Sequence, residues 1–164
     1  MNVIIDLENA STIQDIPDQS AFEQWANVAQ NAVIGDRSEV SQKAFNIGIR
    51  IVDETESTQL NSTYRNKHKP ANVLSFSSAV PDFAIPALDE IPLGDLAICA
   101  SVVASEAAEQ QKLPKAHWAH MVIHGVLHLN GFDHDTEAEA NAMETLEIQI
   151  LNGLGFSDPY LIAE

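Results

Sequence analysis

Residues 124–134, HGVLHLNGFDH, constrain the fold of this chain more than any other stretch of its sequence. His124 and His128 have i, i+4 spacing, so on an α-helix their side chains lie on one face, about 6 Å apart. Gly131 can adopt a left-handed conformation, end that helix and turn the chain back, which brings His134 toward the same point. The chain is therefore predicted to place a helix, a tight turn and a third histidine around one centre.

Three imidazoles in this arrangement form the ligand set of a catalytic zinc site. Zinc binds neutral imidazole nitrogens at about 2.0–2.1 Å in tetrahedral geometry, and three protein ligands leave the fourth position open. We therefore predict that His124, His128 and His134 bind one Zn²⁺ ion. The alternative is a chance alignment of surface or core histidines. That alternative is the better interpretation for one histidine on a buried helix, but not for three with a glycine at the turn.

Two further histidines and two aspartates lie beside these ligands. His117 falls on the helix face of His124 but about 10 Å away along the axis, too far for the same ion. His120 is about 60° off that face. We interpret both as residues that line a cleft or pack, and a role for His120 in orienting a ligand stays open. Asp133 either orients an imidazole or caps the loop, and we interpret Asp135 as a loop cap.

The residue after the first histidine bears on the substrate. Zinc peptidases with this spacing carry a glutamate there as general base, whereas this chain has Gly125. Zinc itself lowers the pKa of a coordinated water, but peptide cleavage also needs a group that carries a proton to the leaving amine. Phosphodiester cleavage instead calls for a cation beside the anionic phosphorus. The sequence therefore favours a phosphodiester, with a metallohydrolase acting on peptides or small molecules as the alternative.

The candidate cation comes from the stretch YRNKHK, residues 64–69. The whole chain has 8 Lys and Arg against 24 Asp and Glu, a net charge of −16, which argues against generic nucleic-acid binding. Arg65 is the first basic residue of the stretch and, with His124, is a predicted catalytic residue. Lys67, His68 and Lys69 are predicted to bind substrate. A solvated loop beside a helix end is the alternative, and spacing alone does not place Arg65 near the zinc.

Length and composition predict one globular domain over residues 1–164. The chain is 45% hydrophobic, it has no apolar run long enough to span a membrane, and its first residues lack the basic region of a secretory signal. The single cysteine, Cys99, is interpreted as a core residue and excludes an internal disulfide. These features are typical of a cytoplasmic protein.

Hydrophobic periodicity predicts an α/β (α+β) fold. It indicates strands at 2–7, 45–52, 72–78 and 93–99, and helices at 20–34, 53–65, 101–113, 114–131 and about 136–152. Asp53 or Thr55, and Ser101, are candidate helix caps, and residues 79–92 are predicted to form a long exposed loop. The helix from Pro114 is apolar on nearly every side, which predicts a buried central helix. We expect a small sheet of four strands with about five helices packed on it.

Several stretches resemble the YbeY endoribonuclease family. HGVLHLNGFDH resembles the family signature H-G-x-L-H-L-x-G-[YF]-D-H. LNSTYRNKHKPANVLSF (60–76), LGDLAIC (93–99), HWAHMVIHG and the closing LGFSDPY are similar to further family blocks. Ala71 and Ser77 depart from the pattern, where the family often has Thr and Pro, and neither position belongs to the predicted metal site.

The resemblance implies a small mixed four-stranded sheet with helices and a zincin-like metal helix. It also implies a bacterial, cytoplasmic, metal-dependent endoribonuclease that acts on single strands. It implies roles in maturation of the 3′ end of 16S ribosomal RNA and in ribosome quality control, with zinc on His124, His128 and His134 and with Arg65 in the catalytic cleft. It also implies small-subunit ribosomal proteins and the GTPase Era as partners. Because so acidic a protein should bind free RNA weakly, we predict that a protein partner on the ribosome directs it to RNA.

Overall fold

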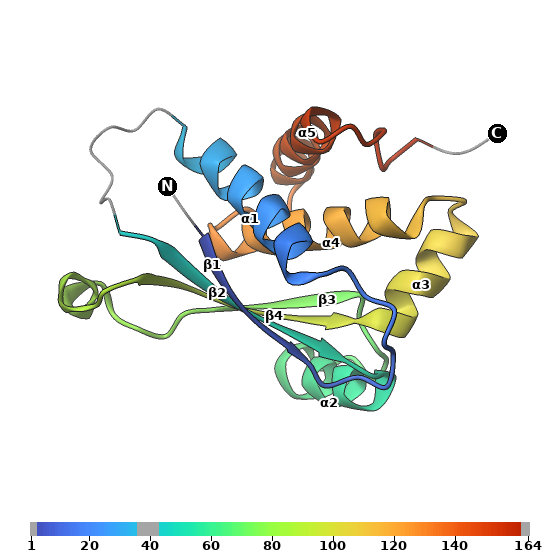
Figure 1. The fold of residues 1–164 in the computed structure, drawn as a ribbon, viewed down its shortest axis with the longest axis horizontal. Helices are drawn as coiled ribbons and strands as arrows, with labels where there is room; N and C mark the ends of the chain where they lie inside the picture. The colour runs from blue at the N-terminus through green and yellow to red at the C-terminus, as the bar shows by residue number, and fades with distance from the viewer. Residues whose placement is uncertain (1–2, 36–42, 162–164) are drawn as a thin grey trace.

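In the computed structural model, four strands and six helices follow one another along the described residues, 3–35 and 43–161 (Figure 1). The elements are β1 (Val3–Asn9), α1 (Gln19–Ile34), β2 (Phe45–Val52), α2 (Glu54–Arg65), β3 (Val73–Ser77), the 3-10 helix η1 (Asp82–Ala87), β4 (Ile91–Cys99), α3 (Ala100–Glu109), α4 (Pro114–Leu129) and α5 (Glu137–Gly153). The mixed α/β fold that the sequence predicts is confirmed.

The four strands form one mixed sheet with the order β1-β2-β4-β3. β1, β2 and β4 run parallel, whereas β3 is an edge strand antiparallel to β4. In β2, Ile47, Ile49 and Ile51 are all at most 1% exposed and alternate with less buried residues. One face of the strand therefore belongs to the core, as the period of two in its sequence predicts.

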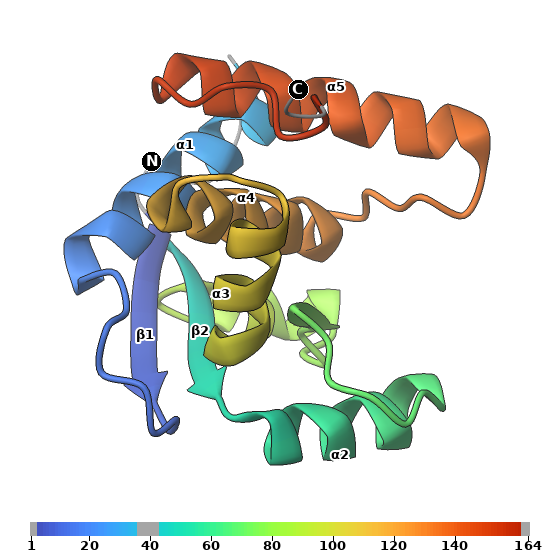
Figure 2. The same ribbon diagram turned by 90° about the vertical axis from the view of Figure 1, so that its right-hand side faces the viewer.

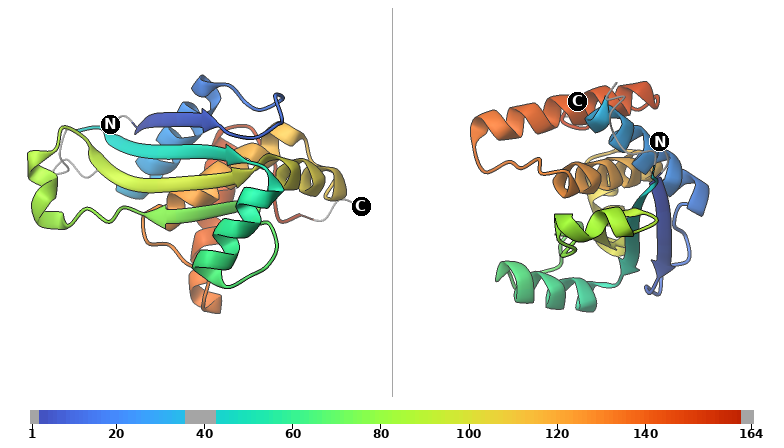
Figure 3. Two further views of the ribbon diagram at one scale, coloured as in Figure 1. Left: turned by 90° about the horizontal axis from the view of Figure 1, so that it is seen from below. Right: turned by 90° about the vertical axis from the view of Figure 1, so that its left-hand side faces the viewer.

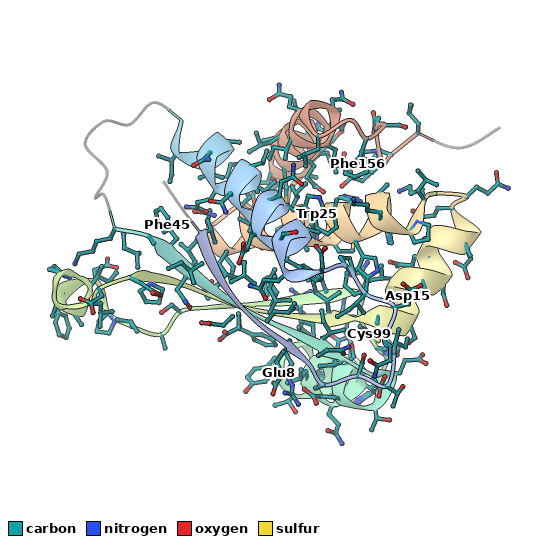
Figure 4. The ribbon with its side chains drawn as sticks, viewed as in Figure 1. Glu8, Asp15, Trp25, Phe45, Cys99 and Phe156 are labelled. Carbon is teal, nitrogen blue, oxygen red and sulfur yellow. The ribbon has the colours of Figure 1, made fainter. Side chains whose placement is uncertain are left out.

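The helices are divided unequally between the two faces of the sheet. α1, α4 and α5 lie on one side, and α2 lies on the other (Figure 1). The view from below shows α2 against the sheet, close to its β3 edge (Figure 3). Side chains fill the space between the sheet and the upper helices, among them Trp25 (Figure 4). Phe22 packs edge-on against Trp118 of α4 with 5.8 Å between ring centroids, which fixes α1 against the central helix.

α4 is the central helix of this upper layer. Pro114 occupies its first turn, where a missing N–H costs no hydrogen bond. From His117 to Leu129 every residue is buried except His124 and His128, which are partly exposed. The predicted buried helix is therefore confirmed, and its two partly exposed residues, His124 and His128, lie one turn apart.

Some predicted details differ from the structure. Residues 79–92 are not one loop, because η1 forms within them and β4 starts at Ile91. Ser101 does not cap α3, since the helix begins at Ala100 with no side-chain cap. Asp53 does occupy the N-cap position of α2, but its carboxylate accepts hydrogen bonds from Thr12 instead. Asn2, at the start of the first predicted strand, lies outside the described residues.

Among the described residues, no helix has both the length and the apolar character needed to cross a membrane.

Candidate metal centre

The C-terminal end of α4 turns sharply at Gly131. This glycine has φ +94°, a conformation that is strained for other residues. Its N–H donates to the carbonyl of His128 at 3.0 Å, and the N–H of Phe132 donates to the carbonyl of Leu127 at 3.1 Å. These bonds satisfy the last helical carbonyls and reverse the chain. The predicted glycine stop is confirmed, and the following segment passes from α4 to α5 (Figure 2).

This turn gathers the three predicted ligands. One ring nitrogen from each of His124, His128 and His134 lies within 4.8 Å of the other two. The Nε2 atoms of His124 and His128 are 3.1 Å apart, close to the separation of about 3.3 Å that two 2.0–2.1 Å bonds make in a tetrahedral zinc site. The donor set and its spacing therefore fit one such ion.

The protonation state of His128 also suits a cation. Burial, together with the charges of the neighbouring His124 and His134, lowers the pKa of the His128 imidazole to about 4. His128 is therefore neutral near pH 7, and a neutral imidazole is the form that binds zinc. The exposed ring of His134 completes the group from the solvent side.

The second nitrogen of His124 faces a buried carboxylate. Glu147 on α5 is 0% exposed, and its Oε2 atom accepts from His120 Nε2 at 2.5 Å and lies 3.4 Å from His124 Nδ1. The Tyr160 hydroxyl donates to the same carboxylate at 3.0 Å. Burial raises the pKa of Glu147, but the bonds from His120 and His124 outweigh it and bring that pKa to about 2. The carboxylate is therefore ionised.

His117 and His120 stand apart from the three ligands, as predicted. His117 Nε2 lies 2.9 Å from a carboxylate oxygen of Glu106 on α3, and His120 is held by Glu147. Both rings line a cavity of about 610 Å³ that reaches His124. The prediction that they line a cleft or pack is confirmed, and Glu147 contacts both His120 and the predicted ligand His124.

Asp133 caps the ligand loop. Its carboxylate accepts the backbone N–H of His134 at 2.8 Å, whereas its distance to the Nδ1 atom of that ring is 4.0 Å. Of the two interpretations that the sequence left open, the structure therefore favours the backbone cap over orientation of the imidazole.

Gly125 packs against the sheet. It is buried, and a Cβ atom built on it would lie 2.7 Å from Cδ2 of Leu96 on β4. The next larger residue already requires movement of Leu96, and a glutamate at this position would point into the helix–sheet contact. The space that a peptidase base would need is therefore filled by the core.

Arg65 ends α2 and is exposed. Asn66 follows in the left-handed conformation with φ +56°, and the buried Asn61 holds the next segment by donating from its side chain to the carbonyl of Lys69 at 2.8 Å. Lys67 and Lys69 are exposed.

His68 is exposed as well. Its Nδ1 atom lies 3.0 Å from the Ser62 hydroxyl, which ties its ring back to α2.

The structure does not bring Arg65 into contact with the three histidines. Neither of the two cavities lined by His124 includes Arg65 among its described lining residues. The C-terminal end of α2 and the segment from α4 to α5 nevertheless project beyond the same side of the molecule, α2 below the sheet and the segment above it (Figures 2 and 3). The basic stretch and the metal centre therefore share one side of the protein.

The comparison with protein families identifies the relatives of the chain. The family model described as Endoribonuclease YbeY matches residues 6–155. The chain belongs to the YbeY endoribonuclease family. The matched range includes the three histidines and the basic stretch, so the resemblance seen in the sequence motifs is confirmed. Because members of the YbeY family are endoribonucleases, membership indicates RNA as the substrate class.

A solved structure supports the fold of this YbeY-family chain. The solution structure of TM1509 from Thermotoga maritima matches with a TM-score of 0.54 and 20% identity, over 96% of this chain and 99% of that one. At this level of identity the likeness supports the fold alone.

Sequence reasoning missed Glu147, the carboxylate behind the predicted metal ligand His124. A signal for it was present on α5, where Met143, Glu147 and Ile150 fall on one buried helix face. An acidic residue in an apolar stripe must find partners when it is buried. In a YbeY-family chain with 24 acidic residues, that position was easy to take as solvent-exposed.

Proposed function

We propose that this protein is a zinc-dependent endoribonuclease that cleaves single-stranded RNA, and that it acts in 3′-end maturation of 16S ribosomal RNA and in ribosome quality control. The observation that carries the proposal is the convergence of His124, His128 and His134. The position where a zinc peptidase has its general base is here Gly125, which is packed on Leu96. Membership of the YbeY family supports RNA as the substrate.

The three histidines would hold one zinc ion. When bound, zinc would supply positive charge at the scissile phosphate and make an attacking water more acidic. The neutral His128 ring and the His124 ring, turned by Glu147, present nitrogen lone pairs to the cation. His124 thereby counts as catalytic through its place at the reacting centre.

Arg65 is the residue that we propose to neutralise the phosphoryl oxygens. A guanidinium can donate two parallel hydrogen bonds to a phosphate, and an exposed position at a helix end leaves it free to meet an extended strand. Lys67, His68 and Lys69 follow on the same loop and would contact the RNA backbone. An RNA bound along this side of the protein would pass from the basic stretch to the metal centre.

The alternative function, hydrolysis of peptides or small molecules, lacks its proton carrier. A peptidase needs a base that delivers a proton to the leaving amine, and position 125 has no room for one. A phosphodiester leaves an alkoxide, whose charge a cation can stabilise directly. The geometry therefore supports the nuclease over the peptidase.

The net charge of −16 bears on how RNA is reached. Since the surface repels phosphates on average, we propose that a protein partner on the small ribosomal subunit delivers the enzyme, which acts in the cytoplasm as one domain over residues 1–164. Small-subunit proteins and the GTPase Era are the candidates from the family resemblance. Tight binding of free RNA at physiological salt would contradict this part of the proposal.

The decisive experiment measures cleavage of a labelled single-stranded RNA by the purified protein with zinc. A duplex of the same sequence and a casein substrate test strand specificity and the peptidase alternative. We expect Arg65→Ala to lower the rate about 100-fold and His124→Ala to abolish it, while Lys115→Ala, an exposed cation on α4, leaves it within about twofold. Unchanged cleavage in both active-site variants would end the proposal.

A further inference from the structure

Glu147 has surroundings that structural packing alone does not require. It is the most deeply buried charged side chain among the described residues, with 0% exposure. Burying a carboxylate is costly unless several donors surround it. The donors here come from two elements, His120 and His124 on α4 and Tyr160 after α5. One acid therefore links the metal-site helix to the C-terminal segment.

The hydrogen bonds fix which nitrogen of each ring carries its proton. An ionised carboxylate only accepts, so His120 Nε2 and His124 Nδ1 must both be donors toward Glu147 Oε2. A His124 ring whose single N–H proton is on Nδ1 carries a lone pair on Nε2. That atom is the one 3.1 Å from Nε2 of His128.

Tyr160 holds the carboxylate from its other side. Its hydroxyl lies 3.0 Å from Oε1 and 3.1 Å from Oε2 of Glu147, and its ring packs edge-on against His120. The backbone N–H of Tyr160 donates to the side chain of Asp158 at 2.8 Å, so a local turn presents the residue. Tyr160 also lines both cavities that adjoin His124.

We propose that Glu147 is the positioning residue of the zinc ligand His124, and that Tyr160 anchors Glu147 in this role. Glu147 fixes the tautomer and the ring direction of His124, and raises the basicity of the nitrogen that meets the ion. The turn that carries Tyr160 thereby supports a metal ligand on a different helix. The inference rests on the zinc-binding part of the proposed function, not on its RNA substrate.

A competing arrangement is a second metal ion. His120, His124 and Glu147 also offer ligand atoms within 4.8 Å of one another. The 2.5 Å separation between His120 Nε2 and Glu147 Oε2 is that of a short charge-assisted hydrogen bond, and it leaves less room between those two atoms than an ion needs. We therefore infer one ion per chain, and a measured stoichiometry of two would overturn the proposal.

The test measures zinc affinity by competition with a chromogenic chelator, together with the His124 tautomer by two-bond ¹H–¹⁵N NMR on the metal-free protein. We expect the wild type to carry the His124 proton on Nδ1. Glu147→Gln should weaken zinc binding about 10- to 100-fold and disturb that tautomer, because an amide has one acceptor for three donors. Tyr160→Phe, which removes only the hydroxyl, should weaken zinc binding about two- to tenfold.

Glu144→Gln is the matched control. It lies one turn earlier on α5, loses the same charge and is partly exposed, and we expect zinc affinity within about twofold of the wild type. If Glu144→Gln weakens zinc binding as much as Glu147→Gln does, the loss of a nearby negative charge alone explains both results, and the proposal is overturned. If Glu147→Gln does not fold, the wild-type NMR spectrum and the Tyr160→Phe variant still test the proposal. A His124 proton on Nε2 in the wild type would contradict it, and so would unchanged zinc affinity in Tyr160→Phe. These measurements do not use RNA cleavage, so a failure of this proposal can be distinguished from a failure of the nuclease proposal.

Discussion

In the first half of α4, His117 and His120 are buried and each faces a carboxylate, whereas in the second half His124 and His128 are partly exposed and face one another. All four come from one helix of 16 residues. The difference lies in what the neighbouring elements supply opposite each ring. Glu106 of α3 engages His117, while the turn at the helix end brings the imidazole of His134 beside His128.

The comparison shows that a ring nitrogen facing a carboxylate serves as a hydrogen-bond donor. A ring whose nitrogen points at an acid has a hydrogen-bond partner and keeps its proton there. A ring that faces other rings has a lone pair directed at a shared point, which only a cation can satisfy for all of them. His124 belongs to both classes, because its two nitrogens face Glu147 and His128 respectively.

The largest expected effect is on zinc affinity, when one histidine from each half of α4 is replaced by alanine and the two variants are compared. His128→Ala removes a ligand, and we expect zinc affinity to fall by at least about 100-fold in chelator competition. His117→Ala should leave zinc affinity within about threefold. It should instead lower the free energy of unfolding by about 1–3 kcal/mol, because Glu106 loses one of its hydrogen-bond partners and keeps Asn72. A zinc defect in His117→Ala comparable to that of His128→Ala would break the distinction between the halves.

Two glycines sharpen the comparison through packing. Gly125→Ala forces a Cβ against Leu96 and should lower the free energy of unfolding by about 1–3 kcal/mol, with zinc affinity little changed. Gly131→Ala meets no atom within 4 Å but strains a residue at φ +94°. It should cost about 1 kcal/mol and also weaken zinc binding, since His134 follows that turn. Urea unfolding measures the change in stability of both variants, and zinc titration measures the change in affinity. A weaker zinc affinity in Gly125→Ala but not in Gly131→Ala would contradict this prediction.

Acid should destabilise the metal-free protein through His128. Burial, together with the charges of His124 and His134, lowers the pKa of the His128 imidazole from 6.5 to about 4. The unfolded chain therefore binds the proton first, so stability is present above about pH 6.5 and is lost as the pH falls toward 4. Between about pH 7.5 and about pH 5.5 we expect His128 to account for a loss of about 1 kcal/mol, since solvent screens the half-buried ring. Urea unfolding of His128→Ala should show a shallower slope over that interval.

The smallest effect is expected at Asp133. Its carboxylate caps the backbone N–H of His134 and does not hold the ring, so Asp133→Ala should weaken zinc binding only about two- to fivefold. Isothermal titration calorimetry can resolve that change. A loss as large as that of His128→Ala would show that the aspartate orients the imidazole after all.

Local patterns allowed much of this structure to be predicted. β2 matches its predicted range of 45–52 residue for residue, and the convergence of the three histidines follows from helix spacing plus one glycine. These features depend on residues close in sequence, where the period of a helix or strand decides the geometry. The 3-10 helix within 79–92 was missed because its prolines were taken as a sign of loop alone.

The features that escaped prediction depend on contacts between distant residues. Glu147 meets His124 from another helix, 23 positions away in sequence, and only its place on a buried stripe distinguishes it from other acids. Gly125 was interpreted through the chemistry it lacks, whereas the structure adds a packing reason in Leu96 of β4. Arg65 stays a prediction, because its approach to the metal centre depends on how the RNA and the end of α2 meet.

The turn at Gly131 has a consequence for the folding of the protein. Since His128 lies inside α4 and His134 lies beyond its end, a shared ion would cross-link the helix terminus to the following segment, much as a short disulfide would. Any opening of that last turn would then require release of the ion. At a free zinc concentration 100 times its Kd the native state would gain about 2.7 kcal/mol, and the amides around residue 130 would exchange with solvent only as slowly as the cross-link permits.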